Sequence, residues 1–341
     1  MDLDGWRARL SQSPEIFPLA IDPATDAVEL RILPRLEYEK ASFLDARLSV
    51  PVAGRVALAE LAEAAAGLPL GGDYIFHVGH VGSTLLSRLL GVHPGVFGLR
   101  EPQALRTLAQ ADGPWSPTDV DIRLDVFSRL YARTWRPNER VILKATSLVS
   151  ELAARMLAIN GAARAILMTT DPEIYVATIL GGPNSRVELA AAAPSRLARL
   201  HQRLGGAVWR TEAMSEGELA AMSWVAEMAA LSGAARSRPG QTLWVDFEAF
   251  LAAPEAELAR ILTFLELPAG QGPVEGILRS GYLERYSKAP EYAYGPKLRR
   301  EVLDASRREH AGELDRARRW LEAARASWPA ALDWTGRDGV A

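Results

Sequence analysis

Residues 73–90 read DYIFHVGHVGSTLLSRLL, and the fold assignment starts from them. The apolar run at 74–78 is typical of a buried strand, and the leucines at 85–90 recur at helical spacing. Between them lies the turn GHVGST at 79–84. Glycines in such a turn direct backbone N–H groups toward an anion, and the positive end of the following helix dipole favours negative charge there. The stretch therefore predicts a site for a phosphorylated compound.

The composition is that of an ordinary globular protein. The chain has 341 residues, of which 48% are hydrophobic and 24% charged, with a formal net charge of -3. This charge argues against a nucleic-acid partner held by bulk electrostatics. Because the chain has no cysteine, disulfides and thiolate metal sites are excluded. No apolar run approaches the roughly 20 residues that cross a bilayer, and the first ten residues have no apolar signal core. We expect a cytoplasmic protein without a membrane partner; its oligomeric state is left open.

Further strands alternate with helical segments after the glycine turn. Buried strands are predicted at 140–144, 163–168 and 241–246, and helices at 85–90, 147–159, 172–180 and about 212–235. This alternation predicts an α/β fold, a central parallel sheet flanked by helices in three layers and similar to the P-loop fold. Ligands of such sheets bind at the carboxyl ends of the strands. The glycine turn, Lys144 and residues 170–172 all follow strands, so we expect one composite site.

The remaining segments are assigned around this core. Residues 1–72 are expected to form an N-terminal extension that packs on a single globular unit, residues 73–341. In the extension we expect a strand at 28–33 and a helix at 56–66. In the C-terminal part we expect a helix at 254–265, an irregular stretch at 280–296 and a charged helix at 297–326. The residues that this last helix is expected to bury are Leu298, Val302, Leu314, Ala317 and Leu321. The loop at 181–186, which contains Gly-Gly-Pro-Asn, is a candidate lid.

The glycine turn differs from that of nucleotide triphosphatases. Those enzymes use G-x-x-x-x-G-K-[ST], whereas here Gly82 is followed directly by Ser83, and no lysine stands between them. ATP or GTP hydrolysis is therefore disfavoured. The alternative without a ligand is a tight strand-to-helix turn. His80 lies inside the turn and could face a phosphate as a cation when protonated, or it could bond the backbone at the start of the helix.

Two charged side chains could supply chemistry beside the turn. Glu101 could accept a proton from an attacking hydroxyl, with the adjacent Arg100 keeping it ionised; the alternative is an Arg100–Glu101 pair on a surface loop. Lys144 ends a buried strand and could stabilise charge on a leaving group; the alternative is a lysine at the rim of the sheet. Asp171 is predicted to cap a helix that begins at Pro172. The histidines show no metal-ligand spacing, and we predict no metal.

Taken in order, these motifs resemble the sulfotransferase family, in its bacterial and tyrosylprotein branches, from about residue 73 to residue 268. The family reads basic-Ser-Gly-Thr-Thr-Leu after its first strand, which matches residues 80–85. A His-Pro turn and a loop that carries the catalytic base match His93-Pro94 and residues 99–101. A strand lysine matches Lys144. The Arg-Asp-Pro of the family, with Ser six residues after its Asp-Pro, matches residues 170–172 and Thr178, and residues 245–268 resemble its later Tyr-Glu-Asp-Leu…Phe-Leu-Gly-Leu-Pro segment.

The resemblance implies sulfuryl transfer from 3′-phosphoadenosine 5′-phosphosulfate (PAPS) to a hydroxyl or amine on a small-molecule or peptide acceptor. It implies that Glu101 is the base and that Lys144 and His80 stabilise the leaving group. Two residues depart from the family: His80 stands where the family has Lys or Arg, and Thr170 replaces the arginine that binds the 3′-phosphate. The residues expected to bind the donor are Gly79, His80, Val81, Gly82, Ser83, Thr84, Leu85, Thr170 and Thr178, with Arg186, Arg285 and Lys288 as candidates to replace the arginine. Two alternatives are a P-loop kinase-like enzyme that uses another nucleotide and a non-catalytic binding protein on the same fold.

Overall fold

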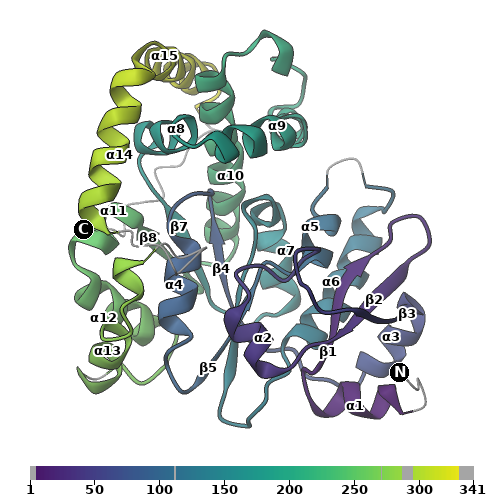
Figure 1. Ribbon diagram of the computed structural model, residues 1–341. Coiled ribbons are helices and arrows are strands. Elements are labelled where there is room, and N and C mark those ends of the chain that lie inside the picture. The colour runs from purple at the N-terminus through teal and green to yellow at the C-terminus, as the bar shows by residue number, and fades with distance from the viewer. Residues whose placement is uncertain (1–4, 111–112, 270, 286–294, 330–341) are drawn as a thin grey trace.

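The computed structural model describes residues 5–110, 113–269, 271–285 and 295–329. A five-stranded sheet forms its centre, in the order β5-β6-β4-β7-β8, and every neighbouring pair is parallel (Figure 1). Its strands are β4 (Asp73–His77), β5 (Val96–Arg100), β6 (Arg140–Lys144), β7 (Ala165–Thr169) and β8 (Thr242–Asp246). The strands predicted at 74–78, 140–144, 163–168 and 241–246 are confirmed within two residues. β5 was not predicted, because it is short and contains a glycine.

Helices cover both faces of this sheet, as the alternating pattern predicts. Parallel strands joined by right-handed crossovers place the helix after β4 on one face and the helices after β5, β6 and β7 on the other. Accordingly α4 (Ser83–Leu90) contacts α13 (Gln271–Leu278), while α7 (Ala153–Ile159) contacts both α6 (Pro117–Tyr131) and α10 (Glu216–Ser237). The predicted fold class, a three-layer α/β fold of the P-loop type, is confirmed.

The other helices connect or extend these layers. They are α1 (Trp6–Gln12), α2 (Arg35–Lys40), α3 (Leu58–Ala65), α5 (Gln103–Leu108), α8 (Pro172–Leu180), α9 (Pro183–Leu204), α11 (Phe247–Ala252), α12 (Pro254–Phe264), α14 (Pro296–Glu309) and α15 (Ala311–Ser327), with 3-10 turns η1 (Ser147–Leu152), η2 (Thr211–Ala213) and η3 (Tyr282–Glu284). Within the described ranges, no helix combines the length and apolar character that crossing a membrane requires.

The N-terminal residues add a second sheet. The strands β1 (Ile16–Ile21), β2 (Ala27–Ile32) and β3 (Val52–Ala57) are antiparallel, in the order β1-β2-β3. Aromatic rings join this part to the central layers: Tyr38 packs on Phe97 with ring centroids 5.1 Å apart, and Phe17 packs on Tyr131 at 5.4 Å. The helix predicted at 56–66 begins only at residue 58, because Val56 pairs with β2. The division of the chain at residue 73 stays a prediction.

Two predictions for the helical parts were wrong. The candidate lid at 181–186 is not a loop throughout, because Pro183 begins α9 and its fixed φ suits a first helical position.

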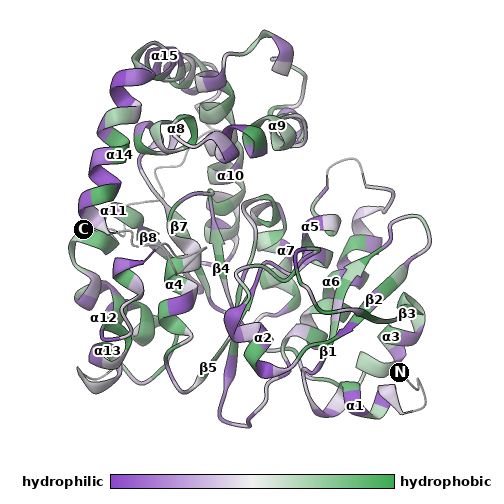
Figure 2. Ribbon diagram, in the orientation of Figure 1, coloured by the Kyte–Doolittle hydropathy of each residue, from purple (hydrophilic) through white to green (hydrophobic). Residues whose placement is uncertain are grey.

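The charged helix at 297–326 is broken at His310 into α14 and α15. Leu298 and Val302 are exposed rather than buried, and the face that packs on α8 carries Leu303. Hydrophilic and hydrophobic segments alternate along α14 in Figure 2, as expected of a helix with one covered face.

Candidate active site

The glycine turn after β4 has a backbone conformation that its glycines permit. Gly79 has φ +100° and Gly82 has φ +67°, in the left-handed region that favours glycine. A Cβ at Gly82 would also overlap the ring of Phe247, which packs directly on the turn. The first residues of α4 follow, and the buried hydroxyl oxygen of Thr84 has no hydrogen-bond partner among the described residues. The turn thus offers backbone and hydroxyl groups to an anionic ligand.

His77 fastens this turn to the end of β6. Its Nδ1 accepts a hydrogen bond from the backbone N–H of Gly79 at 3.0 Å, and its Nε2 donates to the carbonyl of Ala145 at 2.9 Å. The Nδ1 acceptor assigns the proton to Nε2. The sequence analysis assigned His77 no role, because its partner on β6 is distant in sequence.

Glu101 and Lys144 meet at the carboxyl ends of two neighbouring strands. The Glu101 backbone N–H donates to the carbonyl of Lys144 at 2.7 Å, and the Lys144 ammonium forms an ion pair with the Glu101 carboxylate. Lys144 is only 1% exposed. Glu101 has φ +53°, a strained conformation for a residue with a side chain. The edge of the sheet therefore places a carboxylate and an ammonium group in contact.

The expectation that Arg100 keeps Glu101 ionised was wrong. Arg100 ends β5, and its guanidinium is directed toward residues 38–41 of the N-terminal part. It donates instead to the carbonyls of Tyr38, Glu39 and Ala41. Burial, together with the nearby Arg88, lowers the pKa of the Arg100 guanidinium to about 10, which still leaves Arg100 protonated at neutral pH. Lys144 is the cation beside Glu101.

An open cavity of about 850 Å³ lies at this edge of the sheet. It brings together most of the residues that the sequence analysis selected. Those that line it are Gly79, His80, Val81, Gly82, Ser83, Thr84, Leu85, Glu101, Lys144, Thr178 and Arg285. The site residues thus come from the turn after β4, the start of α4, the residue after β5, the end of β6, α8 and the segment after η3, as expected of a composite site at strand ends.

Two of the selected residues lie outside this cavity lining. Thr170 is buried under α10, where its carbonyl accepts a hydrogen bond from the indole of Trp224 at 3.1 Å. Arg186 is on α9, half exposed, and pairs with Glu216 at 2.9 Å. Neither prediction of donor binding is supported by this placement, because Glu216 holds the Arg186 side chain and the Thr170 hydroxyl is buried away from the cavity lining, without a hydrogen-bond partner among the described residues. Lys288 lies outside the described residues.

His80 and Thr178 both line the cavity. His80 has φ +54°, and its ring lies 3.4 Å from the Ser185 hydroxyl and 3.6 Å from the Glu188 carboxylate. The Thr178 hydroxyl donates to the carbonyl of Ile174 at 2.7 Å and keeps its oxygen lone pairs as acceptors. Asp171, predicted to be structural, caps α8 by accepting from the backbone N–H of Glu173.

The cavity also contains residues that sequence reasoning missed. Arg196 on α9 and Arg299 on α14 are both nearly buried and line it. Arg299 pairs with Glu248, and its guanidinium lies over the Phe247 ring, 4.8 Å from the centroid. After Lys144, Thr146 and Ser147 also line the cavity, and the Thr146 hydroxyl is buried without a hydrogen-bond partner in the described part of the chain. Only the buried hydroxyls next to Lys144 could have been inferred from the sequence, by their position after a strand.

Comparisons with known proteins show only distant similarity. No family model matches the chain, and neither does any curated protein. Solved structures that resemble it include sulfotransferase STF1 from Mycobacterium tuberculosis, at 16% identity and TM-score 0.43 over 72% of this chain and 81% of that one. Another is a sulfotransferase from Alicyclobacillus acidocaldarius, at 16% identity and TM-score 0.39 over 75% and 97%. A sulfotransferase domain from the curacin biosynthetic pathway has 14% identity and TM-score 0.42 over 70% and 91%. Each of these TM-scores is below 0.5.

Proposed function

We propose that the protein transfers a sulfuryl group from PAPS to a hydroxyl or amine acceptor. The observation that carries this proposal is the contact between Glu101 and Lys144 in the cavity that the glycine turn also lines. A base and a cation at one point, beside an anion-binding turn, suit transfer of an anionic group without a covalent intermediate on the protein. The motifs that resemble the sulfotransferase family fall on these same residues.

The residues at the turn fit the phosphate end of such a donor. The left-handed glycines let backbone N–H groups face the cavity, and the unpartnered hydroxyl of Thr84 at the start of α4 can donate to a phosphate oxygen. Among the described residues, no group of three or more His, Asp or Glu has an arrangement that could hold a metal ion. Lys144 and, when protonated, His80 supply positive charge in this cavity, and Arg196, Arg285 and Arg299 line it as well.

The reaction uses the ion pair as follows. Glu101 accepts the proton of the acceptor, and the acceptor oxygen or nitrogen forms a bond to sulfur as the bond from sulfur to the bridging oxygen breaks. The bridging oxygen leaves with the electron pair on 3′-phosphoadenosine 5′-phosphate (PAP). Because protonation removes the negative charge of Glu101, Lys144 is released from its partner while charge develops on the leaving oxygen. Lys144 thus pairs with the base before the reaction and stabilises the charge on the leaving oxygen during it.

A thermal-shift titration with PAP tests the donor. A ligand present at 100 times its Kd stabilises the folded state by about 2.7 kcal/mol, and we expect a clear rise in Tm with PAP and none with ATP. Transfer of labelled sulfate from PAPS to a panel of hydroxyl and amine acceptors then tests the reaction. A Tm shift by magnesium-ATP alone would support a kinase-like enzyme, and no shift with any nucleotide would support a non-catalytic binding protein.

Arg299 is the cation that we propose for the 3′-phosphate, in place of the arginine absent at Thr170. It lines the cavity next to Phe247, which packs on the glycine turn, and α14 packs on α8, which carries Thr178. Replacing Arg299 by glutamine should weaken PAP binding by about 10- to 100-fold, because a hydrogen bond to a charged group contributes about 1.5–3 kcal/mol. Binding of AMP, which lacks the 3′-phosphate, should change little.

The matched control is Arg186→Gln, which removes an exposed arginine paired with Glu216 and should leave both affinities unchanged. Calorimetric titration of each variant with PAP and AMP gives the comparison. Equal losses for the two nucleotides in Arg299→Gln would show that Arg299 does not contact the 3′-phosphate, and Arg285 would become the candidate.

A further inference from the structure

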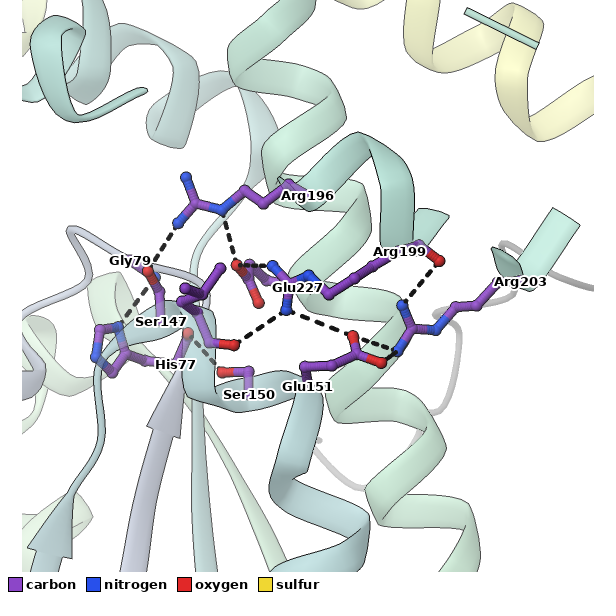
Figure 3. A network of polar contacts seen from close by, with 10 residues as sticks. His77, Gly79, Ser147, Ser150, Glu151, Arg196, Arg199, Arg203 and Glu227 are labelled. Carbon is purple, nitrogen blue, oxygen red and sulfur yellow. Dashed lines mark hydrogen bonds and ion pairs between the residues drawn. The ribbon is translucent and has the colours of Figure 1, made fainter. Parts of the chain in front are cut away.

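A buried ion-pair cluster lies behind the cavity wall, between α9, α10 and η1 (Figure 3). The Arg196 guanidinium donates through Nε to Glu227 at 2.7 Å and through Nη2 to the Ser147 hydroxyl oxygen at 2.8 Å. Arg199 donates to the same carboxylate oxygen of Glu227 at 3.2 Å. The side chains of Arg196, Arg199 and Glu227 are at most 5% exposed. The mechanism described above uses none of them.

The cluster carries more positive than negative charge. Arg199 and Arg203 both pair with Glu151, at 3.4 Å and 2.6 Å, so three guanidinium groups face two carboxylates. Burial lowers the pKa of Arg196, but its interactions with Glu227, Tyr175 and Glu188 together raise it overall, so Arg196 stays charged. Glu188, two turns earlier on α9, is half exposed and lies against His80. Arg196 therefore brings a buried positive charge to the wall of the cavity, which favours an anionic ligand there.

The hydrogen bond from Arg196 determines how Ser147 can act. A guanidinium only donates, so the Ser147 oxygen must accept from it, and the single hydroxyl proton of Ser147 must point elsewhere. Ser147 is 8% exposed and lines the cavity. Its side chain also borders the glycine turn, since a Cβ at Gly79 would lie 3.5 Å from the Ser147 oxygen. The proton of Ser147 is therefore available to a ligand between the turn and Lys144.

We propose that Ser147 donates this proton to an oxygen of the transferring sulfuryl group, and that Arg196 is a positioning residue that orients Ser147. This inference rests on the proposed function. The phosphates are assigned to residues 82–84 at the start of α4, and the sulfuryl group must lie between them and the Glu101–Lys144 pair. Ser147 follows Lys144 by three residues and borders the turn at Gly79. It therefore lies next to the position that the sulfuryl group must occupy.

The test compares Ser147→Ala with the wild-type protein in binding and in rate. We expect calorimetry to show about a 10-fold loss of PAPS affinity with unchanged PAP affinity, because PAP lacks the sulfuryl group. The rate of the chemical step should fall by about 100-fold, on the scale of losing one donor to developing charge. Equal affinities for PAPS in the two proteins, together with equal rates, would overturn the role of Ser147.

Arg196 is tested by Arg196→Lys, which keeps a charge but replaces the two separate nitrogens that contact Glu227 and Ser147 by one nitrogen on a non-planar group. Arg199→Lys is the matched control, since Arg199 shares Glu227 and equal burial but does not line the cavity. We expect only Arg196→Lys to lower the PAPS-to-PAP affinity ratio. In a double-mutant cycle, Arg196→Lys should add nothing to Ser147→Ala, because both act through one hydroxyl.

The outcomes separate the two proposals. A wild-type protein that binds neither PAP nor PAPS refutes both the sulfotransferase function and the role of Ser147. A wild-type protein that binds and transfers, with Ser147→Ala indistinguishable from it, refutes only the inference. If the losses of PAPS affinity in the cycle are additive, Arg196 does not act by positioning Ser147. If Arg196→Lys fails to fold, the Ser147→Ala variant alone decides the role of Ser147.

Discussion

Replacing Glu101 by glutamine should remove turnover and leave PAP binding intact. The amide has the size of the carboxylate and its carbonyl can still accept from Lys144, so the contact at the ends of β5 and β6 is kept. The amide cannot take up a proton from the acceptor, and loss of a general base costs about 10²- to 10⁴-fold in rate. Single-turnover transfer from PAPS and calorimetry with PAP measure the two effects separately.

Asp45→Asn is the control for Glu101. Asp45 is a second carboxylate that lines the cavity, but the Arg47 guanidinium holds it in an ion pair. We expect the asparagine variant to retain the wild-type single-turnover rate. A Glu101→Gln protein that transfers sulfate at the wild-type rate would remove Glu101 as the base, whatever the outcome for Asp45.

Replacing Lys144 by methionine should impair both catalysis and stability. Methionine fills a similar volume, so the change removes the charge with little loss of packing. Loss of one group that stabilises developing charge costs about 10²- to 10³-fold in rate. The variant also leaves the Glu101 carboxylate, 13% exposed, without its partner, and breaking a buried pair in this way costs about 3–5 kcal/mol of unfolding free energy.

Lys40→Met controls for the loss of a lysine in general, since Lys40 is 63% exposed and pairs with Glu37 on the surface of α2. Denaturant unfolding and single-turnover rates of the two variants give the comparison. We expect Lys40→Met to change the unfolding free energy by less than about 1 kcal/mol. If Lys144→Met matched Lys40→Met in both unfolding free energy and single-turnover rate, Lys144 would be an ordinary lysine at the end of a strand.

Several elements of the site follow from local sequence patterns. The glycine turn at 79–84, the strand before it and the helix after it were predictable because each depends on neighbouring residues: an apolar run, glycines that permit positive φ, and leucines at helical spacing. The position of Lys144 at a strand end followed in the same way. These patterns also predicted that the glycine turn and Lys144 share one edge of the sheet, because parallel strands bring their carboxyl ends together.

The charges around the ligand were not predictable from such patterns. Arg186 was a candidate to replace the arginine absent at Thr170, yet it pairs with Glu216, while Arg299, more than a hundred residues away, lines the cavity. The contact of Arg196 with Ser147 likewise joins residues separated by 49 positions. A side chain at such a distance reaches the site only through the packing of its helix.

Local patterns alone predicted the parallel α/β architecture, the glycine turn and the position of Lys144 at a strand end, since backbone conformation and hydrophobic period are local properties; β5, which brings Glu101 to the same edge, was not predicted. The tertiary structure alone decided the partners of those groups: that Lys144, not Arg100, contacts Glu101, and that α9 and α14 bring Arg196 and Arg299 to the cavity. Which charges meet depends on how helices far apart in sequence pack on the sheet, and no local pattern encodes that packing.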